Sequence, residues 1–218
     1  MSLYQFPRWT DAFRPFLAIA ALGAPVYLVA LFYYGASPKT LAVGYQPDQP
    51  VPFSHAMHAG ELEMDCRYCH HSVEQAAFAA VPAASVCMNC HERILSESTA
   101  LAPVVAAAKN GDPLEWVRVH DLPDYVYFNH AGHVNKGVSC VECHGRVDKM
   151  EVVTQMEPLS MGWCLDCHRD PAAKIRPVDE ITNFDWAPED DRGREYAGEQ
   201  LMKHHKIAPR EDCSTCHR

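Results

Sequence analysis

The chain has 218 residues, a formal net charge of −9 and 48% hydrophobic residues, which excludes a disordered chain and a membrane protein with many spans. The length allows one or two small domains, and the acidic charge argues against a nucleic-acid partner. Ten cysteines and thirteen histidines are far more than a chain of this size normally carries, so their spacing is the main source of functional information.

A single apolar segment lies near the start of the chain. Residues 16–34 read FLAIAALGAPVYLVALFYY without a charge, and as a helix they measure about 28 Å, enough to span a bilayer. Arg8 and Arg14 precede the segment and Lys39 follows it, so the positive-inside bias predicts a cytoplasmic N-terminus and an external C-terminal part. A cleaved signal peptide is the alternative, but its apolar core is usually shorter. We therefore expect an uncleaved membrane anchor over residues 1–38.

The ten cysteines form five C-x-x-C pairs, and a histidine directly follows each pair. The pairs are Cys66 and Cys69, Cys87 and Cys90, Cys140 and Cys143, Cys164 and Cys167, and Cys213 and Cys216, followed by His70, His91, His144, His168 and His217. Two thiols at this spacing can form thioethers to the two vinyl groups of a porphyrin while the histidine reaches the iron. Zinc sites and disulfide frameworks need no following histidine, and iron–sulfur ligation needs spare cysteines. The pattern predicts five covalently bound haem c groups.

An internal repeat supplies candidates for the second axial ligand of each iron. F-x-H-x-x-H occurs at residues 53–58 and again at 128–133, each time before a haem motif. Histidines three positions apart on a helical turn point to nearly the same side, so each repeat can serve two haems. We assign His55 to the haem at Cys66 and Cys69, and His130 to the haem at Cys140 and Cys143. His58 and His133 then serve neighbouring haems.

Further ligand candidates lie outside the repeat. His120, ten residues before His130, is the best of the remaining histidines, although hydrogen bonding to a carbonyl is its alternative role. Weaker candidates, for which an exposed surface position is the alternative, are His71, His204 and His205. Methionine ligation raises a haem potential, and the methionines that precede Cys164 are Met150, Met156 and Met161.

The predicted fold is mostly α and irregular, with the haems as its core. About 36 residues are available for each haem of a domain over residues 39–218, too few for an independent apolar core around each cofactor. We expect short helices around Ser98 to Lys109 and around Asp190 to His204, joined by Pro-rich loops. The domain divides into a dihaem module at 45–115, a second at 116–200 and a fifth haem at 201–218. Trp116, Trp163 and Trp186 are expected to pack on haems.

The motifs also resemble known families. F-x-H-x-x-H before C-x-x-C-H resembles the class III multihaem cytochromes, in which bis-histidine haems replace most of the apolar core. The stretches FSHAMHAGELEMDCRYCH, VRVHDLPDYVYFNHAGHVNKGVSCVECHGRVDKMEVV and PLSMGWCLDCHR are similar to the pentahaem cytochrome c subunit of bacterial alternative complex III. The resemblance covers nearly the whole chain, including the N-terminal anchor.

This resemblance implies an electron-transfer role. Such a subunit lies on the periplasmic side of the bacterial inner membrane, in a quinol-oxidising complex with an iron–sulfur subunit and a monohaem cytochrome c. It passes electrons to a soluble carrier or to a terminal oxidase. Residues 41–218 carry 16 basic and 27 acidic side chains, a charge of −11, which fits a basic soluble carrier.

Two other functions compete with this interpretation. A multihaem enzyme such as a nitrite reductase needs an iron with an open position, whereas all five motifs carry histidine and further histidines are available. A stand-alone, membrane-anchored quinol dehydrogenase fits the same topology, but one helix offers only one wall of a quinone pocket. We expect no catalytic residue and no substrate-binding haem in this chain.

Overall fold

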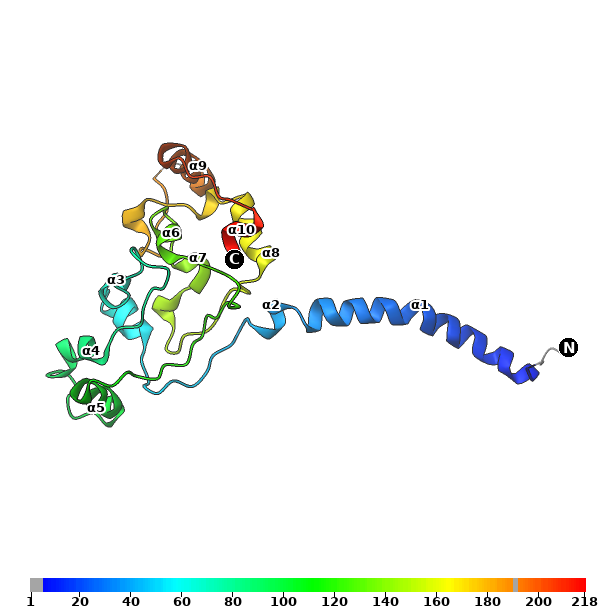
Figure 1. The fold of residues 1–218 in the computed structure, drawn as a ribbon, viewed down its shortest axis with the longest axis horizontal. Coiled ribbons are helices and arrows are strands. Elements are labelled where there is room, and N and C mark those ends of the chain that lie inside the picture. The colour runs from blue at the N-terminus through cyan, green and yellow to red at the C-terminus, as the bar shows by residue number, and fades with distance from the viewer. Residues whose placement is uncertain (1–5, 190–191) are drawn as a thin grey trace. The chain divides into compact units, whose positions relative to one another are not determined.

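The computed structural model of the chain describes residues 6–189 and 192–218. These residues separate into a unit that ends at Ala42 and a second unit, Val43–Arg218. Figure 1 shows the course of the chain through both units. All ten cysteines belong to the second unit.

The first unit consists of one long helical run followed by a short helix. It consists of η1 (Arg8–Phe13), α1 (Arg14–Ala30), the π-helical turn η2 (Leu31–Gly35) and the short α2 (Pro38–Leu41). Pro15 occupies the first turn of α1, where a missing N–H leaves no acceptor unsatisfied. The run from Arg8 to Gly35 has 28 residues, and its apolar 18-residue window has a mean hydropathy of 2.1 and no buried part, so the run is long and apolar enough to cross a membrane. It includes the predicted span 16–34.

The second unit is built from short helices joined by long loops. Its elements are η3 (Ala56–Glu61), α3 (Cys66–Cys69), α4 (Ala84–His91), η4 (Thr99–Leu101), α5 (Ala102–Asn110), α6 (His130–Val134), α7 (Val141–His144), η5 (Val147–Lys149), α8 (Met161–Arg169), η6 (Ala172–Lys174), η7 (Val178–Glu180), α9 (Gly193–His205) and α10 (Cys213–Cys216). Extended pairing in the described residues is limited to two isolated bridges. The prediction of a mostly α and irregular fold is confirmed.

Both helices expected from the sequence are present. The segment around Ser98 to Lys109 forms η4 and α5, which ends at Gly111 in the left-handed conformation that glycine adopts without strain. The segment around Asp190 to His204 forms α9, which begins at Gly193. Asp190 itself lies outside the described residues.

The apolar core of the polypeptide is small. Only nine apolar residues are buried among those the structure describes, and seven of them form two separate clusters, one of four residues around Val104 and one of three around Ile181. A domain of this length normally buries most of the surface that its unfolded chain exposes. The chain therefore lacks the apolar contacts that would hold its loops together without further groups in the interior.

Gly198 allows α9 to pack closely on η6. A Cβ at this position would overlap the carbonyl of Ala172, which belongs to the backbone and cannot rotate away. We predict that Gly198→Ala separates the two elements and lowers the free energy of unfolding by about 1–3 kcal/mol. Gly162 in α8 is the matched control, because a Cβ there meets nothing within 4 Å and alanine favours the helix. The guanidinium midpoint of unfolding should fall in Gly198→Ala and rise in Gly162→Ala, each relative to the unsubstituted chain. Equal midpoints in the two variants would contradict the packing argument.

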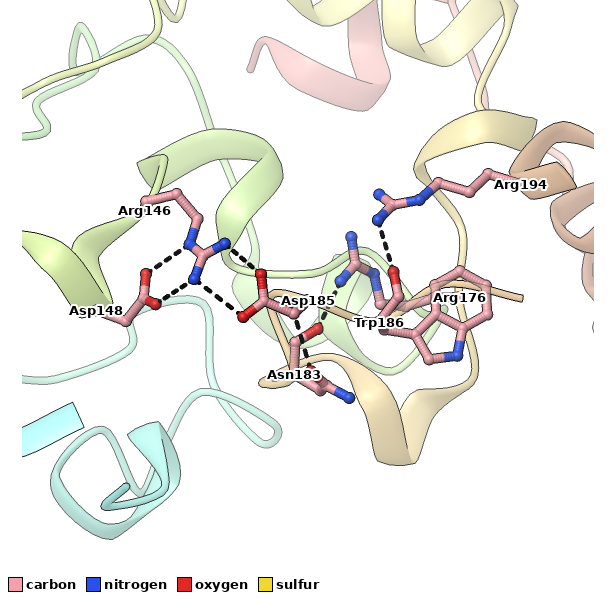
Figure 2. Close-up of polar contacts among 7 residues, drawn as sticks. All are labelled: Arg146, Asp148, Arg176, Asn183, Asp185, Trp186 and Arg194. Carbon is pink, nitrogen blue, oxygen red and sulfur yellow. Dashed lines mark hydrogen bonds and ion pairs between the residues drawn. The ribbon is translucent and has the colours of Figure 1, made fainter. Parts of the chain in front are cut away.

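A network of ion pairs supports the segments that flank α7. Glu142, within α7, accepts from Arg176 at 2.8 Å and pairs with Lys174 at 2.9 Å. Figure 2 shows Arg176 donating to the Asn183 carbonyl, and Arg146 held between two aspartates, Asp148 and Asp185. The network joins residues that are far apart in sequence and so fixes the loops around the third C-x-x-C-H motif.

Candidate functional site

Each of the five C-x-x-C-H motifs forms a short helical turn. The motifs lie on α3, α4, α7, α8 and α10 in chain order. In three of them the histidine amide donates to the carbonyl of the first cysteine at 2.9 Å, as His70 does to Cys66, His144 to Cys140 and His217 to Cys213. The turn thereby holds both thiols and the imidazole of one motif close together, which is the local geometry that attachment to one porphyrin requires.

Side-chain caps support some of these turns. Asp65 accepts from the Arg67 amide at the start of α3, and Ser160 accepts from the Trp163 amide at the start of α8. Such caps stabilise helices that are too short to form alone. Asp212, before α10, accepts from the hydroxyls of Ser214 and Thr215 and not from a backbone amide.

The cysteines do not form a disulfide framework or zinc centres in this structure. All ten are free thiols, and no three His, Cys, Asp or Glu side chains of residues 6–189 and 192–218 are placed to hold a metal ion. Burial raises the pKa of the Cys143 thiol to about 12. Each motif thus presents two free thiols beside one histidine.

Seven histidines donate their Nδ1–H groups to backbone carbonyls, at donor–acceptor distances between 2.6 and 3.1 Å. The donors are His58, His70, His91, His130, His133, His168 and His217, and their acceptors are the carbonyls of Ser54, Ala80, Ile94, Ala77, Asn129, Arg210 and Tyr125. This hydrogen bond fixes the tautomer and leaves the Nε2 lone pair available, as is usual for metal-ligating histidines.

Three pairs of histidine rings face each other at almost the same distance. The ring centroids lie 6.1 Å apart for His58 and His91, and 6.1 Å for His133 and His168. They lie 6.3 Å apart for His130 and His144, whose planes differ by 8°. Two metal–nitrogen bonds of about 2 Å on opposite sides of one metal ion place ring centroids about 6 Å apart. Each pair combines a histidine of the F-x-H-x-x-H repeat with a motif histidine.

The two repeats share one geometry, which the sequence alone did not predict. Phe53 packs edge-on against His55 at 4.8 Å and stacks on His58 at 4.4 Å. Phe128 does the same with the two histidines of the second repeat, at 4.8 and 4.6 Å. The phenylalanine of F-x-H-x-x-H thus orients both imidazoles, which gives this residue a role beyond apolar burial.

The central histidines are held in the neutral form. Burial, with a smaller effect of His120, lowers the pKa of His144 to about 3. Burial, with smaller effects of His70 and His58, lowers the pKa of His55 to about 4, and the Nδ1 of His55 is buried without a partner. Neutral imidazole is the form that binds a metal ion.

A large cavity connects these groups. Its volume is about 2320 Å³, and its lining includes seven of the ten cysteines and the indoles of Trp116 and Trp163, whereas ordinary ligand pockets measure about 300–1,000 Å³. The indole N–H of Trp116 is buried without a partner. Trp186 packs against the guanidinium groups of Arg176 and Arg194 (Figure 2). Room for several cofactors, available Nε2 atoms and adjacent thiol pairs all fit attached haem groups.

The remaining ligand candidates occupy different environments. His120 lies with its Nε2 3.4 Å from the Nδ1 of His144, and the Nδ1 of His217 donates to the Tyr125 carbonyl. His71, His204 and His205 are exposed, as are Met156 and Met161. Met150 and Met156 pack beside Gly145, the residue after His144. The structure brings none of these exposed side chains into the three ring pairs described above.

Comparison with known proteins agrees with this site. Residues 35–111 match a model of the class III cytochrome c family, and residues 126–218 match a model described as cytochrome c7 and related cytochrome c. The chain is 34% identical over 128 residues to the multihaem cytochrome c subunit of a menaquinone reductase from Nitratidesulfovibrio vulgaris (strain Hildenborough). The match covers 56% of this chain, and the chain spans 59% of the length of that relative. The two matched regions are therefore similar to multihaem cytochromes c of the c7 and class III types, whose haem c groups are covalently bound.

Proposed function

We propose that this multihaem cytochrome c carries five haems and is the membrane-anchored electron-transfer subunit of a quinol-oxidising complex of the alternative complex III kind. It relays electrons to a soluble carrier or to a terminal oxidase. The observation that carries this proposal is the set of histidine pairs 6.1–6.3 Å apart. An iron bound by two histidines has no position for a substrate, so such a site supports electron transfer rather than catalysis.

Each motif has a defined role in this proposal. The two cysteines of a motif attach one haem through thioethers, and the motif histidine binds its iron through Nε2. We assign His55 to the iron held by His70, His58 to that held by His91, His130 to that held by His144, and His133 to that held by His168. We retain the division into modules at 45–115, 116–200 and 201–218 as part of the same proposal.

Haem c supplies reversible one-electron chemistry. The residues of the chain supply the conditions for it. The Nδ1–H hydrogen bonds hold the imidazoles in the ligating tautomer, the phenylalanines of the repeats orient them, and His144 is partly buried. These are the means by which a protein sets haem potentials.

We further propose that His120 is a positioning residue for His144. The motif histidines 70, 91, 168 and 217 each donate Nδ1–H to a carbonyl, whereas the Nδ1 of His144 faces the Nε2 of His120. This contact uses the nitrogen of His120 that would otherwise reach an iron.

His120→Ala tests this role. The variant should keep the same low-spin fraction as the unsubstituted chain, because no iron loses a ligand. One haem potential should rise by up to about 59 mV, the shift that a tenfold change in a one-electron equilibrium produces, since His144 loses an acceptor that increases its basicity. Potentiometric titration with optical and electron paramagnetic resonance detection measures both effects. A new high-spin signal would instead identify His120 as an axial ligand.

The N-terminal helix and the charge of the chain support the remaining parts of the proposal. The run Arg8–Gly35 serves as the anchor, and the positive-inside bias puts the haem domain in the periplasm. The net charge of −11 on residues 41–218 favours a basic soluble acceptor. Partner subunits include an iron–sulfur protein and a monohaem cytochrome c, as in the family that the sequence resembles.

The name of the relative supports a second candidate function. That protein belongs to a menaquinone reductase, so the same relay can operate towards quinone instead of away from it. A stand-alone, anchored quinol dehydrogenase is a third arrangement. In all three the chain carries electrons, and the difference lies in the direction of transfer and in the location of the quinone site.

Stopped-flow reduction by a quinol analogue distinguishes these candidates. The haem-loaded chain in detergent is compared with the same chain inside its gently purified membrane assembly. Fast reduction in the assembly alone supports a relay fed by a neighbouring subunit. Fast reduction of the haems in the isolated chain supports the stand-alone dehydrogenase. If the haems are reduced only by a periplasmic donor and then pass electrons to quinone, the reverse relay is supported. Intact mass must show five attached haems in each case; fewer would contradict the proposal.

A further inference from the structure

We propose that the five C-x-x-C-H motifs form one unbranched row in the order second, first, third, fourth, fifth. The haems of the second and fifth motifs are then the two ends at which electrons are exchanged with partners. This inference rests on the proposed electron-transfer function and specifies its route. The order differs from the order of the motifs in the sequence.

The first and second motifs are joined by one helical turn. His55 and His58 both belong to the segment that opens η3. The ring of His58 lies 6.1 Å from that of His91 in the second motif. His55, on the same turn, is the ligand assigned above to the first motif, and Asn89 in α4 donates to the Tyr68 hydroxyl in α3 at 3.0 Å. One turn therefore contributes a side chain to each of two motifs, which must be neighbours.

The third and fourth motifs are joined in the same way. His130 and His133 both lie on α6. The ring of His130 lies 6.3 Å from His144 of the third motif, and the ring of His133 lies 6.1 Å from His168 of the fourth. The repeat thus produces two equivalent pairs of neighbouring motifs.

The first and third motifs connect these two pairs. The backbone N–H and the Nδ1–H of His130 both donate to the Ala77 carbonyl, while His70 donates to the carbonyl of Ala80. The segment 77–80 therefore lies against a histidine of each module. Asn135, just after α6, also donates to the carbonyl of Glu74, just after the first motif, at 2.8 Å.

The fifth motif extends the row from the fourth. His168 donates to the carbonyl of Arg210 at 2.7 Å, and Arg169 pairs with Glu211 at 3.0 Å, which holds the segment before α10 against the end of α8. Figure 1 shows α4, α3, α7, and then α8 with α10, following one another across the unit.

Exposure identifies the ends of the row. Of the ten cysteines, only Cys90 in the second motif and Cys213 in the fifth are exposed. In the third motif, at the centre, Cys140, Cys143 and His144 are all partly buried. Exchange of electrons with a partner requires an accessible haem edge, which the two end motifs provide and the central motif does not.

The positions of the irons in the haem-loaded chain test the row directly. Anomalous scattering at the iron edge from crystals of the full chain should give five irons. The four shortest iron–iron separations should join motifs two and one, one and three, three and four, and four and five. The haem edges of the second and fifth motifs should be the most exposed.

Two results would overturn the proposal in distinguishable ways. Five irons in another order, a branched arrangement, or an exposed haem at the third motif would reject the row and leave the electron-transfer function intact. Fewer than five haem irons would reject the pentahaem function itself. Because the native chain is used, neither result depends on the folding of a variant.

Discussion

His130→Ala is expected to convert one haem from low-spin to high-spin without detaching it. Cys140, Cys143 and His144 remain in place to hold the porphyrin and one side of the iron, but the ring that lies 6.3 Å from His144 is removed. An iron that loses one of two strong-field ligands becomes high-spin or takes up water. The affected fraction should be roughly a fifth of the haem in a pentahaem chain.

Electron paramagnetic resonance and absorption spectra of the variant measure this conversion, and intact mass confirms that the haem is still attached. The backbone amide of residue 130 still donates to Ala77, so the helix α6 is expected to keep its position. His204→Ala is the matched control, because His204 is exposed at the end of α9. An unchanged low-spin spectrum in His130→Ala would reject the pairing with His144.

The double variant His120→Ala/His130→Ala separates the two histidines near His144. His120 approaches the Nδ1 side of that imidazole, whereas a ligating imidazole must lie beyond the Nε2 side, with the iron between. The double variant should therefore show the same high-spin fraction as His130→Ala alone. If high-spin haem appeared only in the double variant, His120 would be able to replace His130 as a ligand.

The sequence predicts the attachment residues and the repeat because both depend on short spacings. C-x-x-C-H and F-x-H-x-x-H each span at most six residues, so a single helical turn expresses their geometry. The helices η4 and α5 were likewise predictable, since STALAPVVAAAK combines good helix formers with a proline in the first turn of α5.

Contacts between distant residues were not predictable from the same patterns. His58 and His133 were assigned only to unspecified neighbouring haems, and the structure places them opposite His91 and His168. The carbonyls that accept from the motif histidines come from loops, for instance Ala80 and Arg210. Every residue type carries a carbonyl and loops have no period, so no sequence signal marks these acceptors.

Arg176→Met is expected to destabilise the haem domain by about 3 kcal/mol, because removing one partner of a buried ion pair leaves the other charge uncompensated. The Arg176 side chain is 1% exposed and that of Glu142 is 12% exposed, with a contact of 2.8 Å between them. Arg176 also donates to the Asn183 carbonyl and lies over the ring of Trp186. Lys174 continues to neutralise part of the charge on Glu142, which keeps the cost near the lower end of the range for buried pairs.

Guanidinium unfolding of the haem-loaded chain, followed through the haem absorption, measures the loss. Arg118→Met is the control, since Arg118 and Asp121 form an exposed pair at 2.7 Å and such pairs contribute little.

Adding Glu142→Gln to Arg176→Met should restore part of the stability, because the uncompensated carboxylate is gone. Glu142 lies between Cys140 and Cys143, so the single variant should also broaden the signals of one haem. A midpoint equal to that of the Arg118 control would show that the buried pair does not hold α7 in place.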